Sequence, residues 1–185
     1  MGTARSRTDM PAGTIVVGID GSPASTQALD WAGEQARLDK RRITLLHATG
    51  GAASLPAVWP GGMAYHQAEV IDALREGGRE LLDEAGAHLS ERFPEVPVTE
   101  VLSTSDPRAA LVEASTHAAM VVVGAHDRGP VRSMLHSSIG VAVTRHAACP
   151  VVVVRTVEPV TRPRPVLVSV NGAPPARRRA GTRAG

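Results

Sequence analysis

Short, unbroken apolar runs alternate with longer helical patterns along most of this 185-residue chain. The apolar runs that predict buried strands span residues 14–20, 43–48, 96–102, 119–124 and 151–155. Helical spacing of apolar residues predicts helices at 23–40, 64–92, 106–117 and 138–146. A strand that is apolar on both faces needs cover on both faces, which a parallel sheet between two layers of helices provides. The alternation therefore predicts an α/β fold with a single open parallel sheet, joined by right-handed crossovers.

The helical patterns also predict which residues cap the helices and which enter the core. Ser22 before Pro23 is a typical N-cap followed by proline at the first helical position, and Asp106-Pro107 starts another helix. In the long helix we expect these residues to face inward: Val70, Ile71, Leu74, Leu81, Leu82 and Leu89. In the first helix the residues close to helical spacing are Ala28, Leu29, Ala32, Ala36 and Leu38. We expect the glycines at 77 and 78 to bend the long helix.

The amino-acid composition limits the classes of protein to which this chain can belong. The chain is 43% hydrophobic and 21% charged, which suits one soluble domain, and with only 2% aromatics its core must be aliphatic. The single cysteine, Cys149, excludes an internal disulfide framework, and we expect it to be a small apolar core residue in a reducing cytosol. No apolar run approaches the ~20 residues of a membrane span, and the first residues lack the apolar core of a signal peptide. A cytoplasmic protein without a membrane partner is expected.

The formal charge of +2 and the pI of 9.3 conceal an uneven distribution. Residues 159–185 hold six arginines and no acid, and residues 1–13 carry a net +1, which leaves −5 for the part between them. We therefore expect a disordered N-terminal tail at 1–13, a folded domain at 14–157 and a basic Pro/Arg-rich tail at 158–185. Because no aromatic residue lies between the arginines, a solvated tail is favoured over a nucleic-acid-binding one.

A short internal repeat lies within the basic tail. Residues 166–175, VLVSVNGAPP, align without a gap on residues 15–24, IVVGIDGSPA. The matching Gly and Pro positions favour a remnant of the first strand and turn of a second domain. The alternative is a chance match, because any apolar pentamer before Asn-Gly looks similar.

The segment at 121–155 has the layout of a phosphate-binding corner: a strand, a loop with Gly and Ser, a short helix and a strand. In such corners the loop amides and the helix N-terminus face an anion. This loop nevertheless carries Asp127, a carboxylate where a phosphate would be expected.

Taken together, these pieces resemble the universal stress protein family over residues 14–156. The matching segments are IVVGIDGSPAST, TLLHA, DPRAALVEAS, the glycine loop and TRHAACPVVVVR. The resemblance implies a flavodoxin-like fold, similar to the adenine nucleotide alpha hydrolases, whose five strands run in the order 3-2-1-4-5 with helices on both faces. It also implies a homodimer formed through the last strand, an apolar sheet edge. The two-domain form common in the family is what the repeat at 166–175 would reflect.

In that strand order the first and fourth strands are neighbours, and ligands of open α/β sheets bind where such strands diverge. The resemblance therefore implies ATP as the ligand. The residues that would bind it are Ile19, Asp20, Ala48, Val123, Gly124, His126, Asp127, Ser137, Ser138 and Ile139. Asp20 would lie beside the adenosine and Ala48 would touch the base. The alternative for Asp20 is a turn residue that bonds an amide near Ser22.

Nucleotide-binding members of the family carry Gly, two residues, Gly, nine residues, Gly, then Ser or Thr. Gly124 and Ser138 match this pattern, whereas Asp127 and Ser137 replace glycines. Two like charges 4 Å apart repel by ~1 kcal/mol in water and ~4 kcal/mol at an effective dielectric of 20, enough to weaken ATP binding several-fold to several-hundred-fold.

A Mg²⁺ ion between Asp127 and the phosphates would reverse this repulsion. Arg128, Arg132 and the loop histidines would also supply positive or donor groups. Both alternatives, a competent ATP site and a degenerate one, remain open at this point.

The sequence favours a non-enzymatic stress-response module. Ser137 and Ser138 have no evident base and orienting group, and no Cys/His cluster has metal-ligand spacing. His47 and His146 are expected to be packed or hydrogen-bonded residues. The alternatives are an ATP-binding protein with weak nucleotide hydrolase activity, and a dimeric interaction protein that needs no nucleotide.

Overall fold

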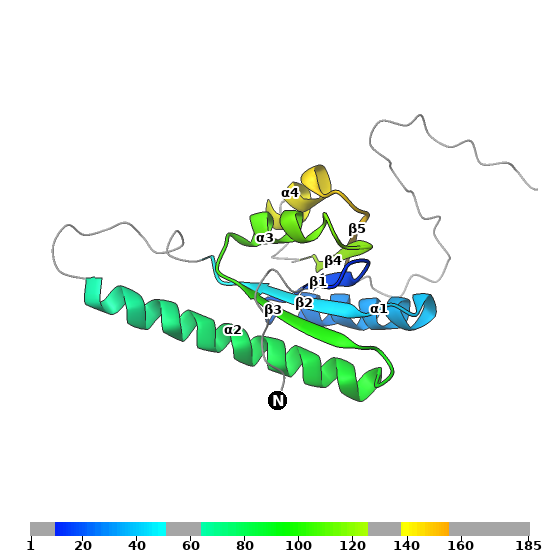
Figure 1. Ribbon diagram of the computed structural model, residues 1–185, viewed down its shortest axis with the longest axis horizontal. Coiled ribbons are helices and arrows are strands. Elements are labelled where there is room, and N and C mark those ends of the chain that lie inside the picture. The colour runs from blue at the N-terminus through cyan, green and yellow to red at the C-terminus, as the bar shows by residue number, and fades with distance from the viewer. Residues whose placement is uncertain (1–9, 51–63, 126–137, 156–185) are drawn as a thin grey trace, which may run out of the picture.

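A computed structural model describes residues 10–50, 64–125 and 138–155, and it contains one five-stranded sheet in the order β3-β2-β1-β4-β5 (Figure 1). All four strand pairs are parallel. The strands are β1 (Ile15–Gly18), β2 (Ile43–Ala48), β3 (Val98–Ser103), β4 (Met120–Gly124) and β5 (Val151–Val154). The predicted sheet and its strand order are confirmed, with β3 at an edge as Pro97 indicated.

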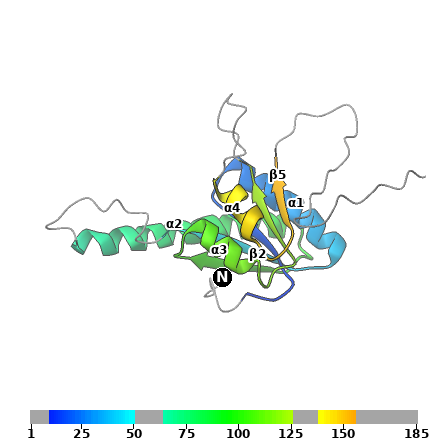
Figure 2. The same cartoon turned by 90° about the horizontal axis from the view of Figure 1, so that it is seen from above.

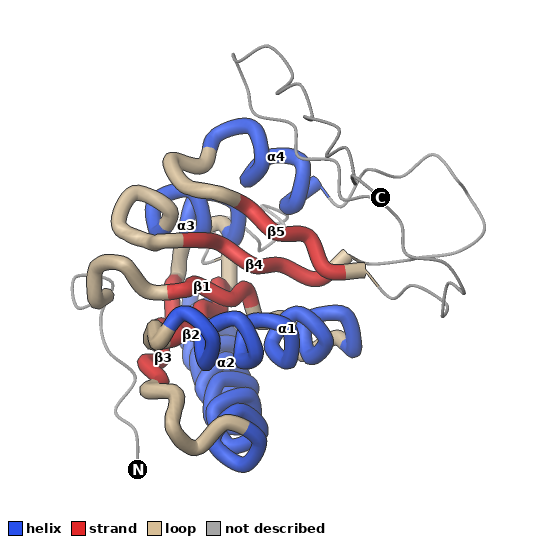
Figure 3. The backbone as a smooth tube through the Cα atoms, turned by 90° about the vertical axis from the view of Figure 1, so that its right-hand side faces the viewer, coloured by secondary structure: helices blue, strands red, loops and turns tan. Residues whose placement is uncertain are grey.

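Two layers of helices cover the sheet (Figure 3). The helices α1 (Pro23–Asp39) and α2 (Ala64–Arg92) pack on one face, and α3 (Pro107–Ala114) and α4 (Ser138–His146) pack on the other. Successive residues of a strand point to opposite faces, so Ile15 and Val17 enter one core cluster while Val16 enters the other. Each layer thus has its own aliphatic core, joined through the buried strands.

Local chemistry sets both ends of α1. Ser22 is the N-cap, with its side chain accepting from the Ser25 amide, and Pro23 follows at the first helical position, as predicted. The helix ends at Lys40, which takes the left-handed conformation with φ 52°. Leu38, in the last turn of the helix, is 66% exposed, whereas the other residues close to helical spacing are buried.

The 29-residue helix α2 is continuous, and its N-terminal half extends past the sheet (Figures 1 and 2). Leu82 and Leu89 are fully buried, but Val70 is 40% exposed and Leu74 38% exposed. Their predicted inward placement was wrong because the sheet does not reach them. The glycines at 77 and 78 do not interrupt the helix, since helical residues continue on both sides of them.

Several sequence predictions fall outside the described residues. They concern the N-terminal tail at 1–9, the loop residues at 126–137 and the whole segment from 156 to 185, including the repeat at 166–175. None of the described helices is both long enough and apolar enough to cross a membrane.

Candidate functional site

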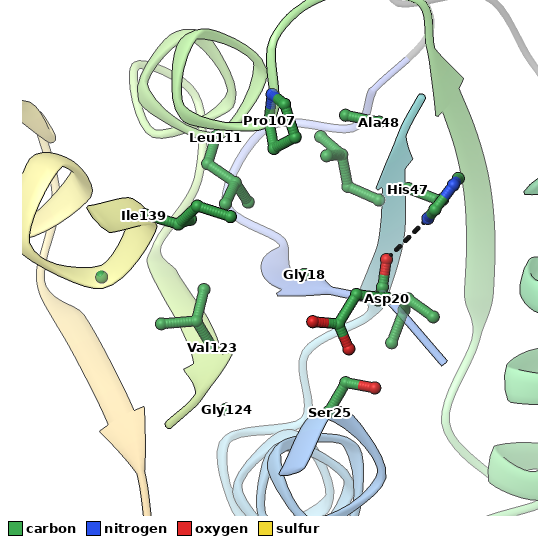
Figure 4. Close-up of a pocket in the computed structure, with 13 residues that line it drawn as sticks. Gly18, Asp20, Ser25, His47, Ala48, Pro107, Leu111, Val123, Gly124 and Ile139 are labelled. Atoms are coloured by element: carbon green, nitrogen blue, oxygen red, sulfur yellow. Dashed lines mark hydrogen bonds between the residues drawn. The ribbon is translucent and has the colours of Figure 1, made fainter. Parts of the chain in front are cut away.

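A crevice of about 160 Å³ opens at the carboxyl edge of the sheet, between the ends of β1 and β4 (Figure 4). The helices that follow β1 and β4 lie on opposite faces of the sheet. The ends of these two neighbouring strands therefore form the switch point of the sheet. The lining residues are Gly18, Ile19, Asp20, Ser25, Leu46, His47, Ala48, Pro107, Leu111, Val123, Gly124, Ile139 and Gly140. The position follows from topology alone, as the sequence predicted.

Six of the ten predicted site residues meet in this crevice: Ile19, Asp20, Ala48, Val123, Gly124 and Ile139. Ser138 is the first residue of α4. The other three predicted residues, His126, Asp127 and Ser137, lie outside the described residues. The structure therefore describes the strand ends of the predicted site and the helix that follows its loop.

The walls of the crevice are mostly aliphatic. Leu46 lines the crevice from β2. Pro107 and Leu111 come from α3, and Val123 and Ile139 come from β4 and α4 (Figure 4). Such a slot suits a flat, weakly polar ring, with a few polar groups at its rim to orient it.

Asp20 supplies the carboxylate of the site. Its side chain is directed toward the crevice, while its Oδ1 accepts from the Ser22 amide at 3.0 Å (Figure 4). The structure shows the turn bond with Ser22, and this bond holds the Asp20 side chain beside the crevice.

Gly124, the first glycine of the loop pattern, is required by packing. A Cβ at this position would run into the carbonyl of Ala24 and would lie 2.8 Å from the Ser25 nitrogen. The N-terminus of α1 therefore abuts the end of β4 directly. The sequence suggested that this glycine serves a phosphate, but the packing of α1 demands it without any ligand.

Three helices contribute residues to the crevice, and two of them, α1 and α3, carry their own caps. Ser22 caps α1, and the carboxylate of Asp106 accepts from the Arg108 and Ala109 amides at the start of α3. The third helix, α4, contributes Ile139 and Gly140 to the lining of the crevice.

His47 shapes the end of the β1–β2 ladder. The last ladder bond runs from the Ile19 amide to the Leu46 carbonyl, at 2.9 Å. The Ile19 carbonyl then accepts from His47 Nδ1 at 2.8 Å, and since a carbonyl only accepts, Nδ1 carries the hydrogen. The sequence predicted a hydrogen-bonded histidine but not this partner, which lies 28 residues away.

The backbone of Ala48 faces the crevice as a consequence. In a parallel ladder alternate residues direct both backbone groups to the same neighbour. Leu46 directs its groups to β1 and Thr49 bonds to β3 through Ser103, so Ala48 is directed toward β1. The chain that follows β1 turns away at Asp20. Ala48 therefore lies at the wall of the crevice and not beside a continued β1.

The remaining chemistry-bearing residues lie apart from the crevice. Cys149 is half-buried against the α3/α4 core, and burial raises the pKa of its thiol. His146 is exposed at the end of α4. Within the described ranges, no group of three or more His, Cys, Asp or Glu side chains could hold a metal ion.

The fold and the switch-point crevice define an α/β protein of the flavodoxin-like class. The sequence model of the universal stress protein family matches residues 12–155, and the chain belongs to this family. A universal stress protein of Mycolicibacterium smegmatis is 35% identical over 141 residues, covering 76% of this chain and 45% of the relative. Universal stress protein Rv2623 of Mycobacterium tuberculosis is 34% identical over 171 residues, covering 86% and 54%. The chain thus spans about half the length of these relatives.

Solved structures of the family share the fold. UspA of Lactobacillus plantarum superposes with a TM-score of 0.65 at 18% identity, covering 80% of this chain and all of that chain. A family member from Burkholderia pseudomallei gives 0.57 at 28% identity, covering 77% and 96%. A universal stress protein of Archaeoglobus fulgidus in complex with dAMP gives 0.54 at 21% identity, covering 78% and 98%.

Proposed function

We propose that this chain is a non-enzymatic, cytoplasmic stress-response module that binds an adenine nucleotide at the β1/β4 switch point. The observation that carries the proposal is the backbone of Ala48, presented to an aliphatic slot at the strand ends. The complex of a related universal stress protein with dAMP supports a nucleotide as ligand.

The base would lie against Ala48. An amide N–H and a carbonyl on one side of a strand match the acceptor N1 and the donor N6 amino group of adenine. In the same pose guanine presents the opposite pattern, so its edge would leave polar groups unpaired. The aliphatic walls from Leu46 and Leu111 would cover the ring faces.

The ribose would lie against Asp20. A carboxylate at the end of a first strand accepts hydrogen bonds from sugar hydroxyls, and such charge-assisted bonds are stronger than neutral ones. The bond that Asp20 accepts from the Ser22 amide orients the carboxylate before a nucleotide enters.

The phosphates would then extend toward α4 and the loop before it. There the sequence replaces two glycines by Asp127 and Ser137, and the added carboxylate repels each further phosphate charge. We therefore propose a site that is complete at the nucleoside end and partly degenerate at the phosphate end. ATP would bind best with Mg²⁺, which offsets part of the repulsion.

Titration of the isotope-labelled protein with AMP tests this function. We expect amide signals of Asp20, Ala48 and Val123 to shift together and saturate, with no release of inorganic phosphate when ATP is supplied instead. Shifts confined to other elements, or none at millimolar AMP, would contradict the site. Steady phosphate release that tracks the protein concentration would favour a hydrolase.

We also propose that the chain forms a homodimer through β5. This strand ends the described sheet, consists of four valines, and leaves Val153 38% exposed. An apolar edge of this kind pairs readily with a second copy. Light scattering of the intact chain measures the mass directly, and a monomer at high micromolar concentration would contradict the pairing.

A further inference from the structure

We infer that His47 is the positioning residue that gives the crevice its preference for adenine over guanine. This inference rests on the proposed nucleotide function and deepens it. His47 is itself one of the residues that line the crevice, and it acts by holding the Ile19 carbonyl, so that the Ala48 backbone remains available at the crevice wall.

The β1–β2 ladder ends one hydrogen bond before Ala48. After the bond from the Ile19 amide to Leu46, the next bond would run from the Ala48 amide to the Ile19 carbonyl. That carbonyl instead accepts from the His47 ring at 2.8 Å. The ring therefore bonds the same oxygen that a continued ladder would join to the Ala48 amide, and it fixes the peptide just before Asp20.

The ring is held in place from behind by α2. A Cβ added to Gly78 would lie 2.8 Å from His47 Cδ2 and 2.7 Å from Leu102 Cδ1, closer than real Cβ contacts. Leu102 is the register partner of His47 on β3. The imidazole thus lies between the Ile19 carbonyl and the bare backbone of α2, which leaves it little freedom to leave its hydrogen bond.

Two substitutions at position 47 separate the hydrogen bond from the packing. His47→Asn places an amide nitrogen near the position of Nδ1 and keeps the donor. His47→Leu fills similar space without a donor, which frees the Ile19 carbonyl. A structural role alone would lower stability in both variants without changing base preference.

The adjacent glycines of α2 give a matched pair outside the crevice. Gly78→Ala pushes on the His47 ring, whereas Gly77→Ala meets no atom within 4 Å. Both changes favour helix by the same amount, about 1 kcal/mol. A difference between them in nucleotide binding therefore reports the position of His47.

The experiment measures dissociation constants for AMP and GMP with the intact chain and these four variants. We expect AMP to bind at least about tenfold more tightly than GMP in the parent protein and in Gly77→Ala. We expect the ratio to fall to about threefold or less in His47→Leu and Gly78→Ala, and His47→Asn to restore most of it. An unchanged ratio in His47→Leu would overturn the inference.

A second readout needs no nucleotide and separates this inference from the function on which it rests. Hydrogen exchange of the Ala48 amide should be at least about tenfold slower in His47→Leu than in the parent, because the amide then pairs with the freed Ile19 carbonyl. Equal exchange rates of the Ala48 amide in His47→Leu and in the parent protein would overturn the inference even if AMP binds. Slowed exchange without any AMP binding would support the role of His47 in the ladder and overturn the nucleotide function alone.

Discussion

The nucleoside end and the phosphate end of the crevice are formed by different kinds of structure. The nucleoside end is built from strand termini, where Gly18, Ile19 and Val123 are buried or half-buried and fixed by the sheet register. The phosphate end depends on the loop between β4 and α4, where Asp127 and Ser137 replace glycines of the family pattern. Residues that the core needs cannot change freely, whereas a loop can lose its phosphate chemistry without cost to the fold.

Gly124 illustrates the difference between the nucleoside end and the phosphate end, because it lies where the two meet. It fits the loop pattern of the nucleotide-binding members, yet the approach of α1 already requires it. Retention of this glycine therefore says little about phosphate binding. Asp127, which stands where the family pattern has a glycine, bears more directly on phosphate binding because it adds a negative charge.

The largest expected effect is on stability. Gly124→Ala places a Cβ against the Ala24 carbonyl, and because that neighbour is backbone the helix must shift. We expect the free energy of unfolding to fall by about 3 kcal/mol, measured by urea denaturation. Gly77→Ala is the control, and a loss of less than about 0.5 kcal/mol in Gly124→Ala would mean that α1 yields easily.

A smaller effect is expected at the ribose. Asp20→Asn keeps an oxygen that accepts from the Ser22 amide but removes the charge. We expect AMP affinity to fall about thirtyfold, near 2 kcal/mol, with the melting temperature nearly unchanged. Calorimetric titration measures the affinity. If Asp20→Asn binds AMP as the parent does, Asp20 is a turn residue only.

At the phosphate end, Asp127→Gly should tighten ATP binding about tenfold in the absence of Mg²⁺, near 1.4 kcal/mol. AMP should respond much less, because fewer charges reach the loop. Asp127→Asn removes the charge without adding backbone freedom, so it assigns the gain to one cause or the other. Equal ATP affinity in all three proteins would show that the carboxylate was never the obstacle.

The smallest effect on stability is expected at the edge strand. Val153→Lys introduces a charge on a residue that is already 38% exposed, so unfolding should change by less than about 0.5 kcal/mol. The mass measured by light scattering should nevertheless fall to that of a monomer, with AMP affinity retained. A dimer that survives this change would place the interface elsewhere.

The residue pattern predicted the strands and helices because apolar runs and turn residues act locally, whereas the strand order and the place of the crevice came from the resemblance to the family. It misplaced Val70 and Leu74, since a helical pattern continues past the edge of the sheet without any change in the residues themselves. It also gave no partner for His47, whose bond to Ile19 joins segments far apart in the chain. Such contacts follow from strand register, which the residue pattern does not specify alone.

The most direct test of the account compares AMP and ATP by calorimetric titration of the intact protein, with and without Mg²⁺. The account predicts that AMP binds at least as tightly as free ATP, because the nucleoside end supplies the affinity and Asp127 opposes the added phosphates. We expect Mg²⁺ to reduce the difference in affinity between AMP and ATP. Mg-ATP binding far tighter than AMP, with a dissociation constant below about 100 µM, would contradict a degenerate phosphate end.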